Sequence, residues 1–142
     1  MTSGIEADKP FLDELPPPSD LGSYEYILDE ESVRRHRAAT HQTAGEGPAA
    51  ARLAPVSILA SDGLRLIVES FEVPEALHAS QEMEVVNTPS VGSRITVRGR
   101  LEEKSVKKGR VFIVVATTSE DDEGRILVRA RTTLALPERA GV

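Results

Sequence analysis

The chain has 142 residues, a net charge of −6 and no cysteine. Its length fits a single domain, and the lack of cysteine excludes disulfides, thiolate metal sites and a cysteine nucleophile. An acidic chain in which 4% of residues are aromatic lacks the basic surface and the stacking side chains that nucleic-acid binding needs.

The chain carries no recognisable targeting pattern. Its first residues, MTSGIEADKP, include acids and no apolar core, unlike a secretory signal. No apolar run is long enough to cross a bilayer. We therefore expect a cytoplasmic protein without a membrane partner, which also agrees with the absence of cysteine.

Residues 1–21 are expected to be a flexible N-terminal tail. The run Pro16–Pro18 resists both helix and strand. Phe11, Leu12 and Leu15 are the apolar residues in this segment that are able to attach it to the domain.

The first regular elements are predicted between residues 23 and 40. The stretch SYEYIL alternates apolar and polar residues, which indicates a short strand. Asp29 occupies an N-cap position, and acids fill the first turn of the helix predicted over 29–40. We expect His36 on the solvent side of this helix.

A loop of small residues, AATHQTAGEGPAAARLAP, separates that helix from a second one. Pro55 suits the first turn of a helix, which we predict to run to about Ser70. Its apolar residues cover most of the circumference, so it is expected to be buried on nearly all sides. Asp62 and Gly63 interrupt the apolar pattern.

From residue 79 the pattern has a period of two. Four strands are predicted, over 79–89, 93–109, 110–119 and 125–136, with tight turns that favour an antiparallel meander. In the second of them one face carries Ile95, Val97, Gly99 and Leu101. The fold class is therefore α+β, a curved antiparallel sheet wrapped round one long apolar central helix.

This order of elements resembles the MaoC-like branch of the hot-dog fold, over residues 22–137. The phrases that carry the resemblance are YEYILDEESVRRHRAAT, LAPVSILASDGL, LHASQEMEVVNTPSVGSRITVRGRLEEKSVKKGR and DDEGRILVRARTTLAL. It implies one hot-dog domain between the N-terminal tail and a short C-terminal tail, 138–142. It also implies a dimer with a like or an unlike hot-dog subunit, because an open sheet leaves an edge to cover.

The resemblance further implies a role in fatty-acid metabolism, with no cofactor beyond the coenzyme A or acyl carrier protein that carries the acyl thioester. The reaction would be a hydro-lyase reaction, the reversible addition of water to an enoyl thioester by an Asp and a His. The alternatives are a catalytically silent thioester-binding module, the non-catalytic subunit of a heterodimeric dehydratase, and a thioesterase.

The loop lacks the family's Gly-Asp and Asn-Pro-x-His phrases. His41 and Glu46 stand near the expected positions at the right spacing, which leaves two interpretations open. They form an acid/base pair with exchanged roles, or the loop has lost the standard chemistry.

The remaining candidate residues concern substrate binding. By family position Pro55 opens the segment whose Ser57 and Ile58 N–H groups face the thioester oxygen, although Ser57 also suits a capping role. His78 is a tunnel-lining candidate. Asp62, at a tunnel mouth or dimer seam, and Glu69 are the carboxylates to test for thioesterase chemistry. Three scattered histidines give no metal-ligand spacing.

Overall fold

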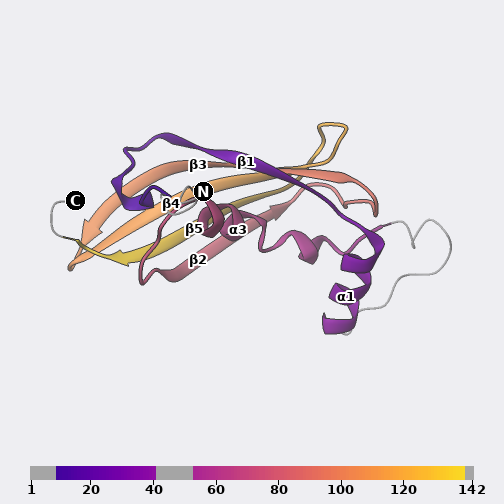
Figure 1. The fold of residues 1–142 in the computed structure, drawn as a ribbon, viewed down its shortest axis with the longest axis horizontal. Coiled ribbons are helices and arrows are strands. Elements are labelled where there is room, and N and C mark those ends of the chain that lie inside the picture. Colours follow the sequence, from indigo (N-terminus) through magenta and orange to yellow (C-terminus); the bar gives the residue numbers. More distant parts are fainter. Residues whose placement is uncertain (1–8, 41–52, 140–142) are drawn as a thin grey trace, which may run out of the picture.

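A computed structural model describes residues 9–40 and 53–139. These residues form one antiparallel sheet with the strand order β1-β3-β4-β5-β2. The strands are β1 (Ser19–Ile27), β2 (Leu77–Val85), β3 (Arg94–Lys107), β4 (Arg110–Glu120) and β5 (Ile126–Pro137). The helices are η2 (Leu12–Glu14), α1 (Glu30–Thr40), η3 (Val56–Leu59) and α3 (Asp62–Ser70). Figure 1 shows α3 against one face of the curved sheet, with α1 at one end of the molecule.

The core lies between α3 and the sheet, as the alternating pattern of the strands predicts. Burial alternates residue by residue along β4 and along the first half of β3. One cluster of buried side chains gathers round Leu12, Ile67 and Phe71, and another round Leu28, Leu59 and Leu66. The four residues predicted on one face of β3 are all buried, so a period of two identified that face correctly.

Two glycines allow α3 to approach the sheet closely. A Cβ on Gly99 of β3 would lie 2.5 Å from Leu66 Cδ2, and a Cβ on Gly63 would lie 2.6 Å from Thr117 Oγ1. Real Cβ atoms do not come this close to another heavy atom, so a larger residue at either position would require the Leu66 or Thr117 side chain to move.

The central helix differs from the single long helix predicted from Pro55 onward. The described segment has a four-residue 3-10 turn, η3, followed by the nine-residue α3 that begins at Asp62. Ser, Asp and Gly at 61–63 explain the break, because these residues favour helix starts and turns over helix interiors. The first turn of α3 therefore begins where the sequence pattern suggested only an interruption.

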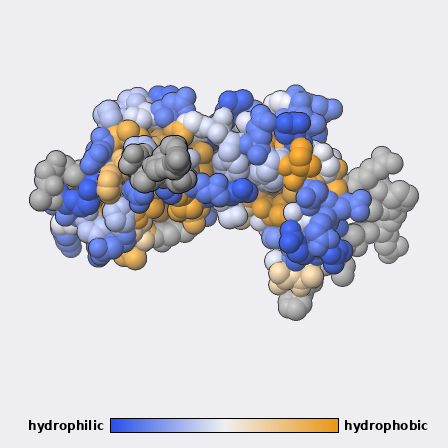
Figure 2. Space-filling model, viewed as in Figure 1, coloured by the Kyte–Doolittle hydropathy of each residue, from blue (hydrophilic) through white to orange (hydrophobic). Residues whose placement is uncertain are grey.

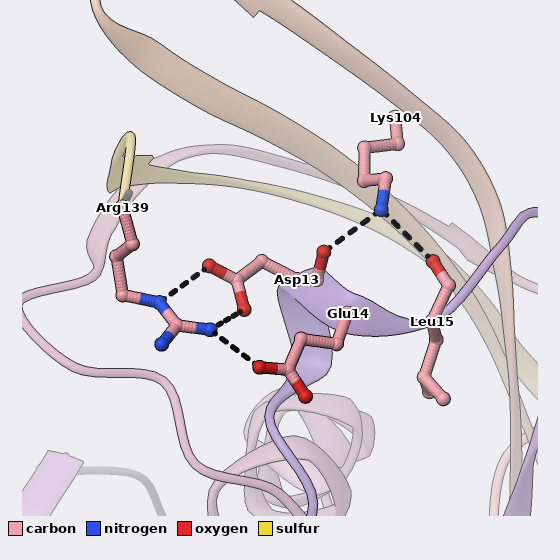
Figure 3. A network of polar contacts seen from close by, with 5 residues as sticks. All are labelled: Asp13, Glu14, Leu15, Lys104 and Arg139. Carbon is pink, nitrogen blue, oxygen red and sulfur yellow. Dashed lines mark hydrogen bonds and ion pairs between the residues drawn. The ribbon is translucent and has the colours of Figure 1, made fainter. Parts of the chain in front are cut away.

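The predicted boundary at residue 22 is too late, because packed structure begins before it. Strand β1 starts at Ser19, and the side chain of Leu12 is fully buried. Figure 3 shows how polar contacts fix this segment: the Arg139 guanidinium donates to the Asp13 carboxylate, and Lys104 Nζ donates to the Asp13 and Leu15 carbonyls. The first residues of the predicted C-terminal tail thus contact the domain as well.

The other face of the sheet carries charged side chains that pair across strands. Arg94 lies 3.2 Å from Glu25, and Arg129 lies 3.2 Å from Glu84. These pairs are half exposed, so each contributes little to stability. Among residues 9–40 and 53–139, no helix has both the length and the apolar character required to span a membrane.

Candidate functional site

Helix α1 and the turn η3 meet through two side-chain contacts. His36 Nε2 lies 2.9 Å from Ser57 Oγ, and Arg37 Nη2 donates to the Leu53 carbonyl at 2.6 Å. The first contact joins a histidine to a hydroxyl, which is the arrangement of a base beside a nucleophile. The second holds the end of α1 beside the first residue described after the loop.

The inward direction of His36 follows from the packing of α1. The Asp29 carboxylate caps the helix by accepting from the Ser32 N–H at 2.7 Å, and Val33 is buried. His36 lies three residues after Val33 and so on the same side of the helix. The expectation of a solvent-facing His36 is therefore wrong, and its spacing from Val33 was the signal that identifies the buried side.

In the turn η3, the Ile58 N–H and the Ser57 hydroxyl make contacts within the domain that the sequence analysis did not predict. Pro55 is the N-cap, and the Ile58 N–H donates to the Pro55 carbonyl at 3.1 Å. That backbone bond already engages one of the two N–H groups expected to face a thioester oxygen. The Ser57 hydroxyl does not cap η3, since its contact is with His36.

Asp62 opens α3 and is surrounded by hydroxyl groups. The Tyr26 hydroxyl donates to both carboxylate oxygens at 3.0 Å, and the Ser119 hydroxyl donates to one of them at 3.0 Å. The Tyr24 hydroxyl donates to the Asp62 carbonyl at 2.9 Å. Asp62 thus ties β1 and β4 to the start of α3. Its side chain is buried and points into its own domain.

Burial dominates the electrostatics of this cluster. It raises the pKa of Asp62 from 3.8 to about 6, against the lowering effects of the Tyr26 and Ser119 hydrogen bonds and of the Arg65 charge. Burial and the neighbouring Asp62 carboxylate also raise the pKa of Tyr26. The Arg65 guanidinium lies over the Tyr24 ring, 5.0 Å from its centroid, and donates to Glu69.

The structure places the other predicted residues as follows. His41 and Glu46 lie outside the described residues. His78 lies within β2, beside a register shift, and not before the strand as predicted. Glu69 is exposed on α3 and accepts a hydrogen bond from Arg65 Nε at 3.0 Å. The described contacts therefore bring Ser57 to His36 and Asp62 to Tyr26, as two separate groups.

The surface hollows of the described residues are lined by side chains other than Ser57, His36, Asp62 and Tyr26. One of about 480 Å³ is on the charged face of the sheet, over Ala116 and Arg131. Another of about 380 Å³ lies beside α1, between Arg37 and Val91. Within the described part of the chain, His, Asp and Glu side chains form no group of three or more that could hold a metal ion.

No protein-family model matches the sequence, and no curated protein matches it. Solved structures do match. The chain superimposes on a MaoC-like dehydratase from Rhodospirillum rubrum with a TM-score of 0.73 and 16% identity, covering 91% of this chain and 97% of that one. The R-hydratase PhaJ1 from Pseudomonas aeruginosa gives a TM-score of 0.75 and 17% identity, over 92% and 88% of the two chains.

A third match is the HadBC complex, a 3R-hydroxyacyl-ACP dehydratase from Mycobacterium tuberculosis. Its TM-score is 0.70 at 16% identity, over 83% of this chain and 95% of that chain. Together with the sheet order and the packing of α3, these matches confirm the fold predicted from the sequence. The chain has the hot-dog fold of the MaoC-like hydratases and dehydratases.

Proposed function

We propose that this protein binds acyl thioesters, carried on coenzyme A or on an acyl carrier protein, beside η3, and that it adds water to enoyl thioesters reversibly. The support is the fold, shared with hydratases and dehydratases, together with the contacts at η3. His36 reaches Ser57, and Arg37 reaches Leu53.

The Arg37–Leu53 contact is the observation on which the proposal depends most. Helix α1 ends at Thr40, and Leu53 is the first described residue after the loop. The contact therefore brings the two ends of the loop that carries His41 and Glu46 to the same place, beside Ser57. In this proposal those two residues supply the general acid and base.

Hydration of crotonyl-coenzyme A and of a longer trans-2-enoyl-coenzyme A, followed by loss of enoyl absorbance, tests this. We expect turnover by the wild type and a loss of about 100-fold or more in His41→Ala and in Glu46→Gln. Glu123→Gln, which changes an exposed acid in the turn before β5, is the matched control and keeps full activity. Unchanged turnover in both loop variants would exclude this acid/base pair.

A second candidate is a non-catalytic hot-dog subunit that binds the thioester while a partner supplies the acid and base. The observation that favours it is the edge strand β2, which among the described residues pairs with β5 alone. Leu77, Met83 and Val85 are 55%, 39% and 51% exposed on it, and an open apolar edge favours pairing with another chain.

Calorimetry with crotonyl-coenzyme A separates the two candidates. Binding without turnover supports the silent subunit, and turnover excludes it.

Light scattering tests whether the β2 edge forms a dimer. We expect a dimer that Val85→Lys converts to a monomer, while Val106→Lys, on the exposed end of β3, leaves the dimer unchanged. A wild-type monomer at micromolar concentration would contradict the assembly.

A further inference from the structure

The described carboxylates of the central segment are poorly placed to direct water at a thioester. Glu69 is engaged by Arg65 on an exposed face. Asp62 is 6% exposed, and the Tyr26 and Ser119 hydroxyls occupy its oxygens. Thioester hydrolysis through either one would require those contacts to break first. The Ser57 hydroxyl offers a different route.

Ser57 and His36 have the geometry of a nucleophile and its base. The distance of 2.9 Å between Oγ and Nε2 is a hydrogen bond, and it joins residues that lie 21 positions apart on two elements. Both side chains are half-buried, so the pair is shielded in part and still reachable. The hydroxyl is not used as a helix cap, which leaves the contact with His36 as its described role.

The surroundings of this pair hold it in place. Val33 of α1 and Ala54, just before η3, are buried members of the cluster round Leu28, Leu59 and Leu66. Val56 and Ile58, the neighbours of Ser57, pack in part against the same cluster. Figure 2 shows apolar residues at the surface where η3 lies between α3 and α1. An apolar surface beside a hydroxyl suits the hydrocarbon part of an acyl group.

We propose that Ser57 accepts the acyl group of a thioester, with His36 as its base, which gives the protein a thioester-hydrolase activity in addition to hydration. Ser57 Oγ attacks the thioester carbonyl carbon while His36 Nε2 takes the hydroxyl proton. The C–S bond breaks, and His36 returns the proton to the leaving thiolate. Water then attacks the Ser57 ester with His36 as base again, and releases the carboxylic acid and the free hydroxyl.

This inference depends on the thioester binding of the proposed function, but not on its hydration chemistry. A saturated thioester separates the two, because butyryl-coenzyme A has no double bond to hydrate. The experiment follows release of coenzyme A thiol with a thiol-reactive dye, and maps the acyl group on the protein by peptide mass spectrometry after rapid acid quench. Crotonyl-coenzyme A hydration is measured on the same samples.

We expect the wild type to release thiol and to carry an acyl group on Ser57. Ser57→Ala should show neither, and His36→Gln should slow release about 100-fold or more. Ser61→Ala, which changes an exposed serine four residues away, is the matched control and releases thiol at the wild-type rate. Circular dichroism checks that each variant is folded.

Three results would overturn the proposal: no thiol release by the wild type, release by folded Ser57→Ala at the wild-type rate, or an acyl group mapped to another residue. If the wild type hydrates crotonyl-coenzyme A but releases no thiol from butyryl-coenzyme A, only the proposed hydrolase activity is excluded. If Ser57 is acylated but crotonyl-coenzyme A is not hydrated, only the proposed hydratase activity is excluded.

Discussion

Asp13 and Asp62, two of the buried aspartates in the described residues, are stabilised by different partners. Asp13, in the N-terminal segment, has no exposed side-chain surface, and the Arg139 guanidinium donates to both of its oxygens, at 2.7 and 3.0 Å. Asp62, at the start of α3, is 6% exposed and accepts hydrogen bonds from neutral hydroxyls. A planar cation compensates a buried negative charge better than hydroxyl dipoles do.

The two environments have different effects on pKa values and on stability. Hydrogen bonding to Asp13 raises the pKa of Arg139 above its usual value. Asp62 has a raised pKa of about 6 because burial outweighs its hydrogen bonds. Its ionised form therefore costs stability at neutral pH, whereas the Asp13–Arg139 pair fastens the first described segment to the last.

The largest effect is expected from Leu12→Ala, which removes the apolar anchor next to Asp13. Leu12 is fully buried against Ile67 and Leu101, so the variant should lose about 2–5 kcal/mol of unfolding free energy. Urea unfolding measures this, with Val106→Ala at an exposed site as the control. A loss under about 1 kcal/mol would show that the segment contributes little to the core.

Asp62→Asn should stabilise the protein at pH 7.5. Because the pKa of Asp62 is raised from 3.8 to about 6, the wild type has its full stability below pH 4 and loses part of it as the pH rises through 6. The loss is at most about 3 kcal/mol. Unfolding measured from pH 4 to 7.5 should show the two proteins diverging over that range, and parallel curves would contradict the raised pKa.

Ser119→Ala tests the hydroxyls directly. Without this donor the ionised Asp62 loses a hydrogen bond, which should cost about 1–2 kcal/mol at pH 7.5. At pH 4, where Asp62 is protonated, the difference from the wild type should shrink. The same urea series gives the comparison. An equal loss at both pH values would mean that Ser119 acts through packing alone.

The smallest effect is expected from Arg139→Lys. Lysine keeps the charge beside Asp13 but loses the two parallel hydrogen bonds and the contact with the Phe11 ring, whose centroid lies 4.1 Å from the guanidinium carbon. The melting temperature should fall by less than in Leu12→Ala. A fall in melting temperature as large as that of Leu12→Ala would show that the guanidinium geometry, and not only the charge, holds the N-terminal segment.

Strands β3, β4 and β5 were predictable from the sequence because their signal is local, but the predicted meander of four strands is wrong for β2, which pairs with β5 and not with β3. Strand β3 alternates Ile95, Val97 and Gly99 with charged or polar residues, and a period of two gives the buried face without knowledge of the partner strands. The same holds for α1, whose start is set by the Asp29 cap. The N-terminal segment was predicted as a flexible tail because of the proline run after residue 15, although Leu12 was named as a residue able to attach it to the domain.

The site was less predictable because its contacts join distant segments. Tyr26 and Asp62 are 36 positions apart, and Ser119 and Asp62 are 57 apart. Nothing local to Asp62 specifies two hydroxyl donors, since they come from β1 and β4 only after the sheet forms. The same reason applies to His36 and Ser57, although the spacing of His36 from Val33 did indicate its buried side.

The Asp13–Arg139 ion pair also constrains how the chain folds during synthesis. Its members are 126 residues apart in the sequence, so closing this contact carries a large loop-closure entropy and makes no contribution to early local structure. On the ribosome, Asp13 emerges long before Arg139 exists. The Asp13 carboxylate can therefore pair with Arg139 only after β5 has been synthesised. The final attachment of the N-terminal segment is then one of the last steps of folding.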